Sequence, residues 1–188
     1  MKKIVFTYGV LAGAINTVIA YLLTTIAGDD LMHANAEWVG YLIMIIALSI
    51  IFVGIKQYRD KHLGGIIKFG KAFLTGLYIA LVASVIYVGV WEIYMQTSGE
   101  GFIDTYQASY METLRAEGAT AKELAEASEK MEYYKKMYSN TFLRMLITLS
   151  EILPVGIIIS LISALLLKNS TVLPASDEDT TSQHLQTD

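Results

Sequence analysis

Four long apolar stretches constrain the fold of this chain more than any other feature of its sequence. They cover residues 4–27, 38–55, 72–91 and 142–167, and the first three contain no charged residue. A helix needs about 20 apolar residues to cross a hydrocarbon core about 30 Å thick. Charged residues make up 17% of the chain and cluster between these stretches. The sequence therefore predicts an all-α integral membrane protein with four transmembrane helices.

The second stretch is the shortest of the four, and aromatic and basic residues flank it. Trp38 and Tyr41 lie at its start, and Lys56, Tyr58 and Arg59 follow its end. Aromatic rings lie at headgroup level and long basic side chains reach toward water, so both kinds of residue anchor a short span. We therefore expect this stretch to cross the membrane with Arg59 at the interface.

The distribution of lysine and arginine between the short connections predicts the orientation. The 56–71 connection is rich in lysine and arginine and has a single acidic residue, whereas the 28–37 connection has acidic residues and no lysine or arginine. Basic connections are retained on the cytoplasmic side. Both termini should therefore be cytoplasmic, with 28–37 and 92–141 facing outward, in a multi-pass protein of the bacterial inner membrane.

The two ends of the chain complete the predicted organisation. Residues 1–168 should form the membrane domain, and the polar 169–188 segment has too few apolar residues to fold alone, so we expect a disordered cytoplasmic tail. The N-terminus also imitates a cleavable signal peptide, because lysines precede an apolar run and Ala34-Asn35-Ala36 follows it. That run is longer than a typical signal core, so we expect it to be retained as a span.

The long connection between the third and fourth spans has the pattern of a helical hairpin over residues 101–140. Gly118 stands where a first helix would end, and Thr120 with Glu123 forms a T-x-x-E capping box that would begin a second. One face of the pair is a candidate partner surface. The alternative is that the two helices bury this face against each other or on the rim of the membrane domain. The candidate surface consists of Tyr106, Tyr110, Met131, Tyr134 and Tyr138.

Small residues recur every fourth position on three of the four spans. Such stripes let helix backbones approach closely, which drives helix association in lipid. They could form the internal bundle or a homodimer, and the internal bundle is the simpler interpretation because every helix must find neighbours. The candidate packing residues are Gly9, Gly13, Gly76, Ala80, Ser84, Gly156 and Ser160.

Polar residues inside spans are few, and they indicate where a transport path could lie. Asn16 lies in the middle of the first span, Glu92 lies at the outer end of the third, and Arg144 and Glu151 lie in the first half of the fourth. Asn16 with Glu151 is a candidate intramembrane site for a proton or cation. The alternative is that Glu151 is close enough to the outer surface to meet water or to pair across helices.

The sequence carries no sign of an enzyme. It has no cysteine, which excludes thiolate metal sites and cysteine nucleophiles, and it has no phosphate-binding glycine loop, H-E-x-x-H or G-x-S-x-G motif. Its three histidines fall in three separate polar segments. The net charge of −4 argues against a nucleic-acid partner. We therefore predict no catalytic residues, no metal and no cofactor.

Two segments of the chain resemble a known family. The string GGIIKFGKAFLTGLYIALVASVIYVG at 64–89 and the string ILPVGIIISLISALLLK at 152–168 are similar to the signature region and the closing helix of domain-of-unknown-function family 4199. That family consists of small membrane proteins found mostly in Bacteroidota. The resemblance implies a four-span membrane protein and supplies no activity. It rests on Gly65, Phe69, Gly70, Gly76, Pro154 and Gly156 in this order.

These patterns together favour a structural or accessory membrane component. Besides the lipid bilayer, its predicted partner is another membrane protein or a second copy of the chain. The alternative is a small transporter or channel component that uses Asn16 and Glu151.

Overall fold

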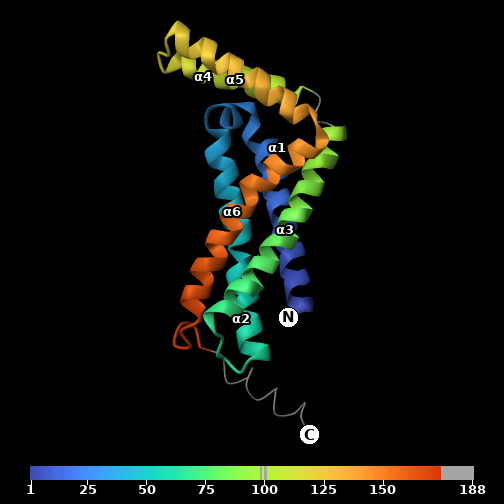
Figure 1. The fold of residues 1–188 in the computed structure, drawn as a ribbon, viewed down its shortest axis with the longest axis vertical. Coiled ribbons are helices and arrows are strands. Elements are labelled where there is room, and N and C mark those ends of the chain that lie inside the picture. Colours follow the sequence, from blue (N-terminus) through green and yellow to red (C-terminus); the bar gives the residue numbers. More distant parts are fainter. Residues whose placement is uncertain (98, 100, 175–188) are drawn as a thin grey trace.

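The computed structural model describes residues 1–22, 38–97, 99 and 101–174 in full, and residues 23–37 by their backbone only. Every regular element in this part of the chain is a helix, as predicted, and no strand occurs in it. The helices are shown in Figure 1. They are α1 (Lys2–Leu48), α2 (Ile50–His62), α3 (Phe69–Thr97), α4 (Phe102–Ala116), α5 (Ala121–Ser139) and α6 (Thr141–Leu167).

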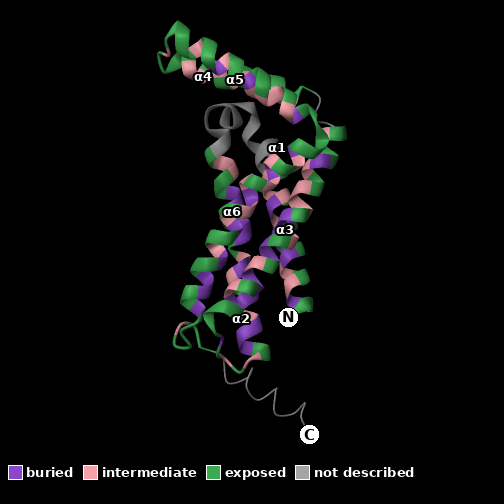
Figure 2. Cartoon of the chain, viewed as in Figure 1, coloured by how far each residue is buried: buried purple, intermediate pink, exposed green. Residues whose placement is uncertain are grey.

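Four stretches of the described helices are long and apolar enough to cross a membrane, in agreement with the sequence. They are Lys2–Leu22, Trp38–His62, Phe69–Thr97 and Thr141–Leu167. Many of their large apolar residues are exposed on the outside of the bundle, and Figure 2 colours the exposed residues green. An apolar exterior of this kind suits lipid contact. The finding indicates a multi-pass membrane protein.

Helix α3 is the central element of the bundle because it packs along both α1 and α6. The described parts of α1, 2–22 and 38–48, run in opposite directions, and the second continues past Ser49 into α2 (Figure 1). The core gathers small and branched side chains from all four spans. Its fully buried members include Ala12, Leu48, Ile51, Ile55, Ile79, Ala80, Ile152 and Ala164.

The predicted small-residue stripes lie between helices of this one chain. A Cβ built on Gly9 would lie 2.5 Å from Val82 Cβ, and one on Gly13 would lie 2.8 Å from Ile86 Cγ2. These distances are shorter than two side chains allow, so only glycine permits α1 to approach α3 here.

The same close approach joins α3 to α6. A Cβ on Gly76 would lie 2.9 Å from Ser160 Cβ, and one on Gly156 would lie 2.7 Å from Ala80 Cβ. Ser84 is also buried on this side of α3. The stripes thus form contacts within the bundle, while the homodimer interpretation is not tested by a single chain.

Helices α4 and α5 lie side by side across one end of the bundle (Figure 1). Gly118 has a φ of +86° directly after α4, and the predicted capping box is present, with Glu123 N donating to Thr120 Oγ1 and Thr120 N donating to Glu123 Oε2. The hydrogen bonds from Thr120 lower the pKa of Glu123. Lys135 on α5 pairs with Asp104 on α4, which raises the pKa of Lys135.

Some predicted features fall outside the described residues. The side chains of the 28–37 connection, including Ala34-Asn35-Ala36, are not described, and neither is the tail from residue 175. The signal-peptide alternative and the disordered tail therefore stay predictions.

We expect Gly76→Leu to lower the free energy of unfolding by about 1–3 kcal/mol or more, because the added atoms would overlap α6 and α2. Gly89→Leu is the matched control, since a Cβ at Gly89 meets nothing within 4 Å. Thermal unfolding of both variants in detergent would measure the difference. Equal stability of the two variants would show that the close approach at Gly76 is not required.

Candidate functional site

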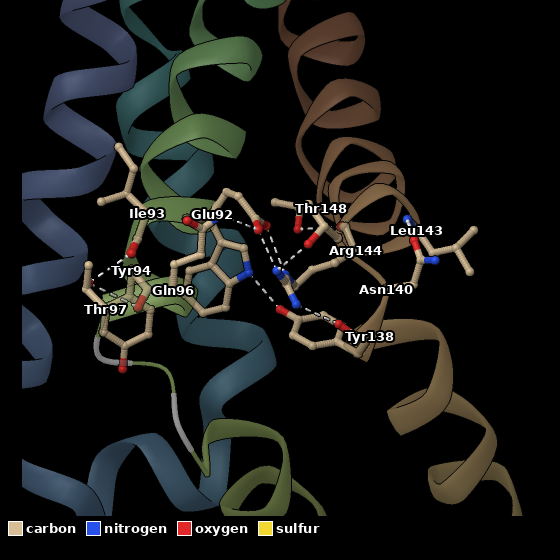
Figure 3. A network of polar contacts seen from close by, with 12 residues as sticks. Glu92, Ile93, Tyr94, Gln96, Thr97, Tyr138, Asn140, Leu143, Arg144 and Thr148 are labelled. Carbon is tan, nitrogen blue, oxygen red and sulfur yellow. Dashed lines mark hydrogen bonds and ion pairs between the residues drawn. The ribbon is translucent and has the colours of Figure 1, made fainter.

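A buried ion pair joins α3 to α6 at the end of the bundle where α4 and α5 lie (Figure 3). Arg144 donates from Nε to Glu92 Oε2 at 2.9 Å and from Nη2 to Glu92 Oε1. Both residues are buried, with exposed fractions of 8% for Arg144 and 5% for Glu92. A two-point contact between guanidinium and carboxylate is strong and directional. In apolar surroundings each charge requires the other, because an unpaired buried charge is costly.

Further hydrogen bonds complete this pair and connect it to α5. Arg144 Nη1 donates to the backbone carbonyl of Tyr138 at 2.8 Å, and Arg144 Nη2 also donates to Thr141 Oγ1 at 3.3 Å. Gln96 Nε2 donates to Glu92 Oε1 at 3.0 Å. The last turn of α5 is therefore attached to α3 and α6 through one guanidinium group.

Aromatic side chains surround the ion pair and bring α4 to the same place. Trp91 Nε1 donates to the Tyr138 hydroxyl at 2.7 Å. The ring of Phe102, the first residue of α4, meets the Trp91 ring edge-on at 5.1 Å between centroids. Three helices besides α6 thus converge here. We refer to Glu92, Arg144, Trp91, Phe102 and Tyr138 as the junction cluster.

The local sequence explains why Arg144 reaches this position. Asn140 is the N-cap of α6, and its side-chain oxygen accepts a hydrogen bond from Leu143 N at 3.1 Å. Asparagine is among the preferred residues at this position because it satisfies a free amide of the first turn. The cap makes α6 begin at Thr141, which places Arg144 one turn inside the helix and facing α3.

The Tyr138 hydroxyl remains neutral in this setting. Burial raises its pKa, the hydrogen bond from Trp91 acts in the opposite direction, and the nearby Glu151 carboxylate is among the groups that raise it further. A neutral phenol accepts the indole hydrogen bond without adding charge beside the ion pair. The arrangement therefore holds four helices together with one cation and one anion.

The predicted pair Asn16 and Glu151 occupies different surroundings. Asn16 is buried on α1, and its Nδ2 donates to no group within the described residues. Gly13 packs on Ile86, so Asn16 lies at about the level of Gly89 on α3. Glu151 is half-buried on α6 and interacts with other groups of the chain. The structure gives no hydrogen bond from Asn16 Nδ2 to Glu151, and their joint role stays a prediction.

The predicted partner surface on α4 and α5 is only partly free. Tyr110 is exposed, Tyr106 and Tyr134 are half-buried, and Met131 and Tyr138 are buried within the chain. Tyr138 belongs to the junction cluster. Two of the five residues are therefore used for internal packing, as the alternative interpretation expected.

A second buried ion pair lies at the opposite end of the bundle, and sequence reasoning missed it. Arg59 was expected at the membrane interface, but its side chain is fully buried. Its Nε donates to Asp60 Oδ1 at 2.6 Å, its Nη1 donates to the Val172 carbonyl at 2.9 Å, and its Nη2 donates to the Leu173 carbonyl. The guanidinium thus fastens the first residues after α6 to α2. Asp60 is the single acidic residue in an otherwise basic connection, and this was the sequence feature that could have indicated the ion pair.

No group of three or more histidine, cysteine or acidic side chains that could hold a metal ion occurs in the described part of the chain. Arg144 is paired with Glu92 and Arg59 is paired with Asp60, and both arginines also donate to backbone carbonyls. This chemistry positions segments of the protein.

The comparison with protein families gives a match over residues 7–169, almost the whole chain. The matching family is described as protein of unknown function (DUF4199). The chain belongs to this family. The predicted resemblance is therefore confirmed, and DUF4199 membership agrees with an uncharacterised membrane protein. Searches of curated proteins and of solved structures gave no match.

The DUF4199 match covers both buried arginines, the first candidate span from residue 7 onward, and the other three candidate spans in full. The description of the family assigns no activity, so roles for the junction cluster follow from its geometry alone. An origin in Bacteroidota stays an expectation.

We expect Arg144→Met to lower the free energy of unfolding by about 3–5 kcal/mol, because it leaves the buried Glu92 carboxylate without its partner. The double variant Glu92→Met with Arg144→Met should lose less than Arg144→Met alone, since it leaves no unpaired charge. Denaturant unfolding in detergent would measure both.

The matched control is Lys122→Met on α5, which removes an exposed contact of 3.9 Å with Glu126. Exposed pairs contribute about 0–1 kcal/mol. If Arg144→Met proved as stable as Lys122→Met, the junction cluster could not be a principal attachment of α5.

Proposed function

We propose that this chain is an accessory component of the bacterial inner membrane that binds a protein partner, or a second copy of itself, through α4 and α5. In this proposal both termini are cytoplasmic, and α4 and α5 form an extracytoplasmic hairpin. The orientation is supported by the lysines and arginine of the 56–71 connection and by Lys2 and Lys3, which the positive-inside rule assigns to the cytoplasm.

The observation that carries the proposal is an open hollow of about 450 Å³ between α4 and α5, near the turn that joins them. Its lining mixes apolar and charged residues, as interaction surfaces do. It consists of Tyr110, Leu114, Glu117, Gly118, Ala119, Glu123, Glu126, Ala127 and Lys130.

The incomplete burial of α4 supports the same conclusion. None of its residues is fully buried, although Tyr110 and Leu114 lie one turn apart on one side of the helix. An amphipathic helix normally covers its apolar stripe. Helix α5 covers this stripe only in part, which leaves Tyr110 exposed beside the hollow. A partner side chain seated in the hollow would complete the burial.

The junction cluster suits this role because it fixes the base of the hairpin. Arg144 holds the end of α5, and the edge-on contact of Phe102 with Trp91 holds the start of α4. The hollow lies toward the other end of both helices. A fixed base reduces the conformational entropy that binding would otherwise cost. The proposed function therefore needs both ends of the hairpin, one for attachment and one for contact.

A photo-crosslinking amino acid at Tyr110, introduced into the full-length chain in native membranes, tests the proposal. We expect one discrete protein adduct, which mass spectrometry would identify as a partner or as a second copy of the chain. The matched control is the same amino acid at Tyr133, which is 65% exposed on α5 but does not line the hollow. Absence of a discrete adduct at Tyr110, or equal adducts at both positions, would contradict docking at the hollow.

One observation favours the second candidate function, a small transporter or channel component. Asn16 Nδ2 is buried in the first span with no hydrogen-bond partner among the described residues. A polar group inside the membrane costs free energy, so its presence there points to a functional site. If this function holds, proteoliposomes of the wild-type chain should conduct protons or a cation, and both Asn16→Ala and Glu151→Gln should lower the flux. A wild-type flux no greater than that of empty liposomes would exclude it.

A further inference from the structure

The end of the bundle opposite α4 and α5 carries lysines without acidic partners. The start of α1, the connection between α2 and α3, and the end of α6 all lie at this end (Figure 1). Five of the exposed lysines here form no ion pair within the described part of the chain. These lysines are Lys2, Lys3, Lys68, Lys71 and Lys168.

The chain supplies no described carboxylate to neutralise them. Asp60 is the one acidic residue at this end within the described ranges, and it is only 4% exposed. Its two oxygens already accept from Lys56 Nζ and Arg59 Nε, each at 2.6 Å. The exposed positive charge is therefore accessible to an anion from outside the bundle.

The connection between α2 and α3 places apolar and basic side chains on the same outer edge. The glycines at 64–65 have φ values of +62° and +82° and turn the chain, and Ile67 is buried in the core and fixes the connection to the bundle. Ile66, Lys68 and Phe69 are exposed. This combination suits the boundary of a bilayer, where apolar side chains enter the acyl region and lysines meet headgroups.

We propose that this end of the chain binds anionic phospholipid headgroups, with Lys68 and Lys71 as principal contacts. The Lys71 ammonium is 5.8 Å from the centre of the buried Tyr58 ring, which restrains it at the base of the bundle. Lys68 precedes it by one turn at the start of α3. A phosphodiester between the two ammonium groups would balance charge that the described part of the chain leaves unbalanced. This proposal does not depend on partner binding at the hairpin.

Native mass spectrometry of the full-length chain in detergent tests the proposal with phosphatidylglycerol as the probe and phosphatidylcholine of the same acyl chains as the reference. We expect phosphatidylglycerol to bind more tightly. Lys68→Gln should weaken its binding about fivefold, and the double variant with Lys71→Gln about 25-fold. The matched control, Lys122→Gln with Lys136→Gln on α5, should leave the dissociation constant unchanged. All four lysines are exposed, and unfolding temperatures would verify that each variant folds.

Equal binding of the two lipids to the wild-type chain would overturn the proposal, as would unchanged phosphatidylglycerol binding by the Lys68 and Lys71 variant. A chain that ends after residue 174 distinguishes binding of lipid from binding of the acidic residues that follow in the sequence, Asp177, Glu178, Asp179 and Asp188. We expect the same dissociation constant as for the full chain. If the lipid preference appeared only in the shortened chain, these carboxylates would be the occupant and the proposal would be wrong.

Discussion

The close approach of α3 to its two neighbours is the constraint on which the rest of the structure depends. Apolar side chains gain little by leaving lipid for a protein interior, so packing must supply the attraction between spans. Gly9 and Gly13 let α1 approach α3, and Gly76 and Gly156 let α3 approach α6. Dispersion forces fall quickly with distance, so these contacts lose much of their attraction if the backbones separate by even one methyl group. The small residues thus set both the spacing of the helices and their register.

The register of α3 against α6 decides which charged groups meet at the ends. Gly76 faces Ser160 and Gly156 faces Ala80, and continuing this antiparallel pairing along the two helices brings Glu92 to Arg144. Arg144 also donates a hydrogen bond to the Tyr138 carbonyl at the end of α5. At the opposite end Arg59 makes equivalent contacts, because it donates to the Asp60 carboxylate and to the Val172 backbone carbonyl. A planar guanidinium suits both positions because its donors form a fork that serves a carboxylate and a carbonyl together.

Sequence reasoning predicted the features that depend on neighbouring residues. The four spans follow from length and composition, and the end of α4 and the capping box of α5 follow from Gly118, Thr120 and Glu123. The ion pairs depend on which helix faces meet. Glu92 and Arg144 were recognised as polar residues within spans, but they are 52 positions apart, and depth in a span does not show which residue lies opposite.

Arg59 illustrates a different limit of sequence reasoning. A basic residue in a basic connection is normally exposed, and the positive-inside pattern gives no reason to treat one arginine differently from its neighbours. Its burial depends on the residues after α6. Their carbonyls accept hydrogen bonds from Arg59, although they lie more than a hundred positions later in the sequence. The helix continues through Arg59 to His62, so the second candidate span is longer than its apolar stretch.

The hydrogen bonding of the buried polar groups indicates where function can lie in this chain. Among the described buried side-chain atoms, Asn16 Nδ2 and Ser84 Oγ are the two without a hydrogen-bond partner, so most interior polar groups are already committed to structure. The surfaces at the two ends differ in character: one has an open hollow with several glutamates, and the other has lysines that form no ion pair within the described residues. Helix α3, with 29 residues and a length of about 44 Å, separates them as a rigid spacer. A protein built in this way suits the proposed role, in which α4 and α5 are held at a constant height above the membrane by attachments at both ends of the bundle.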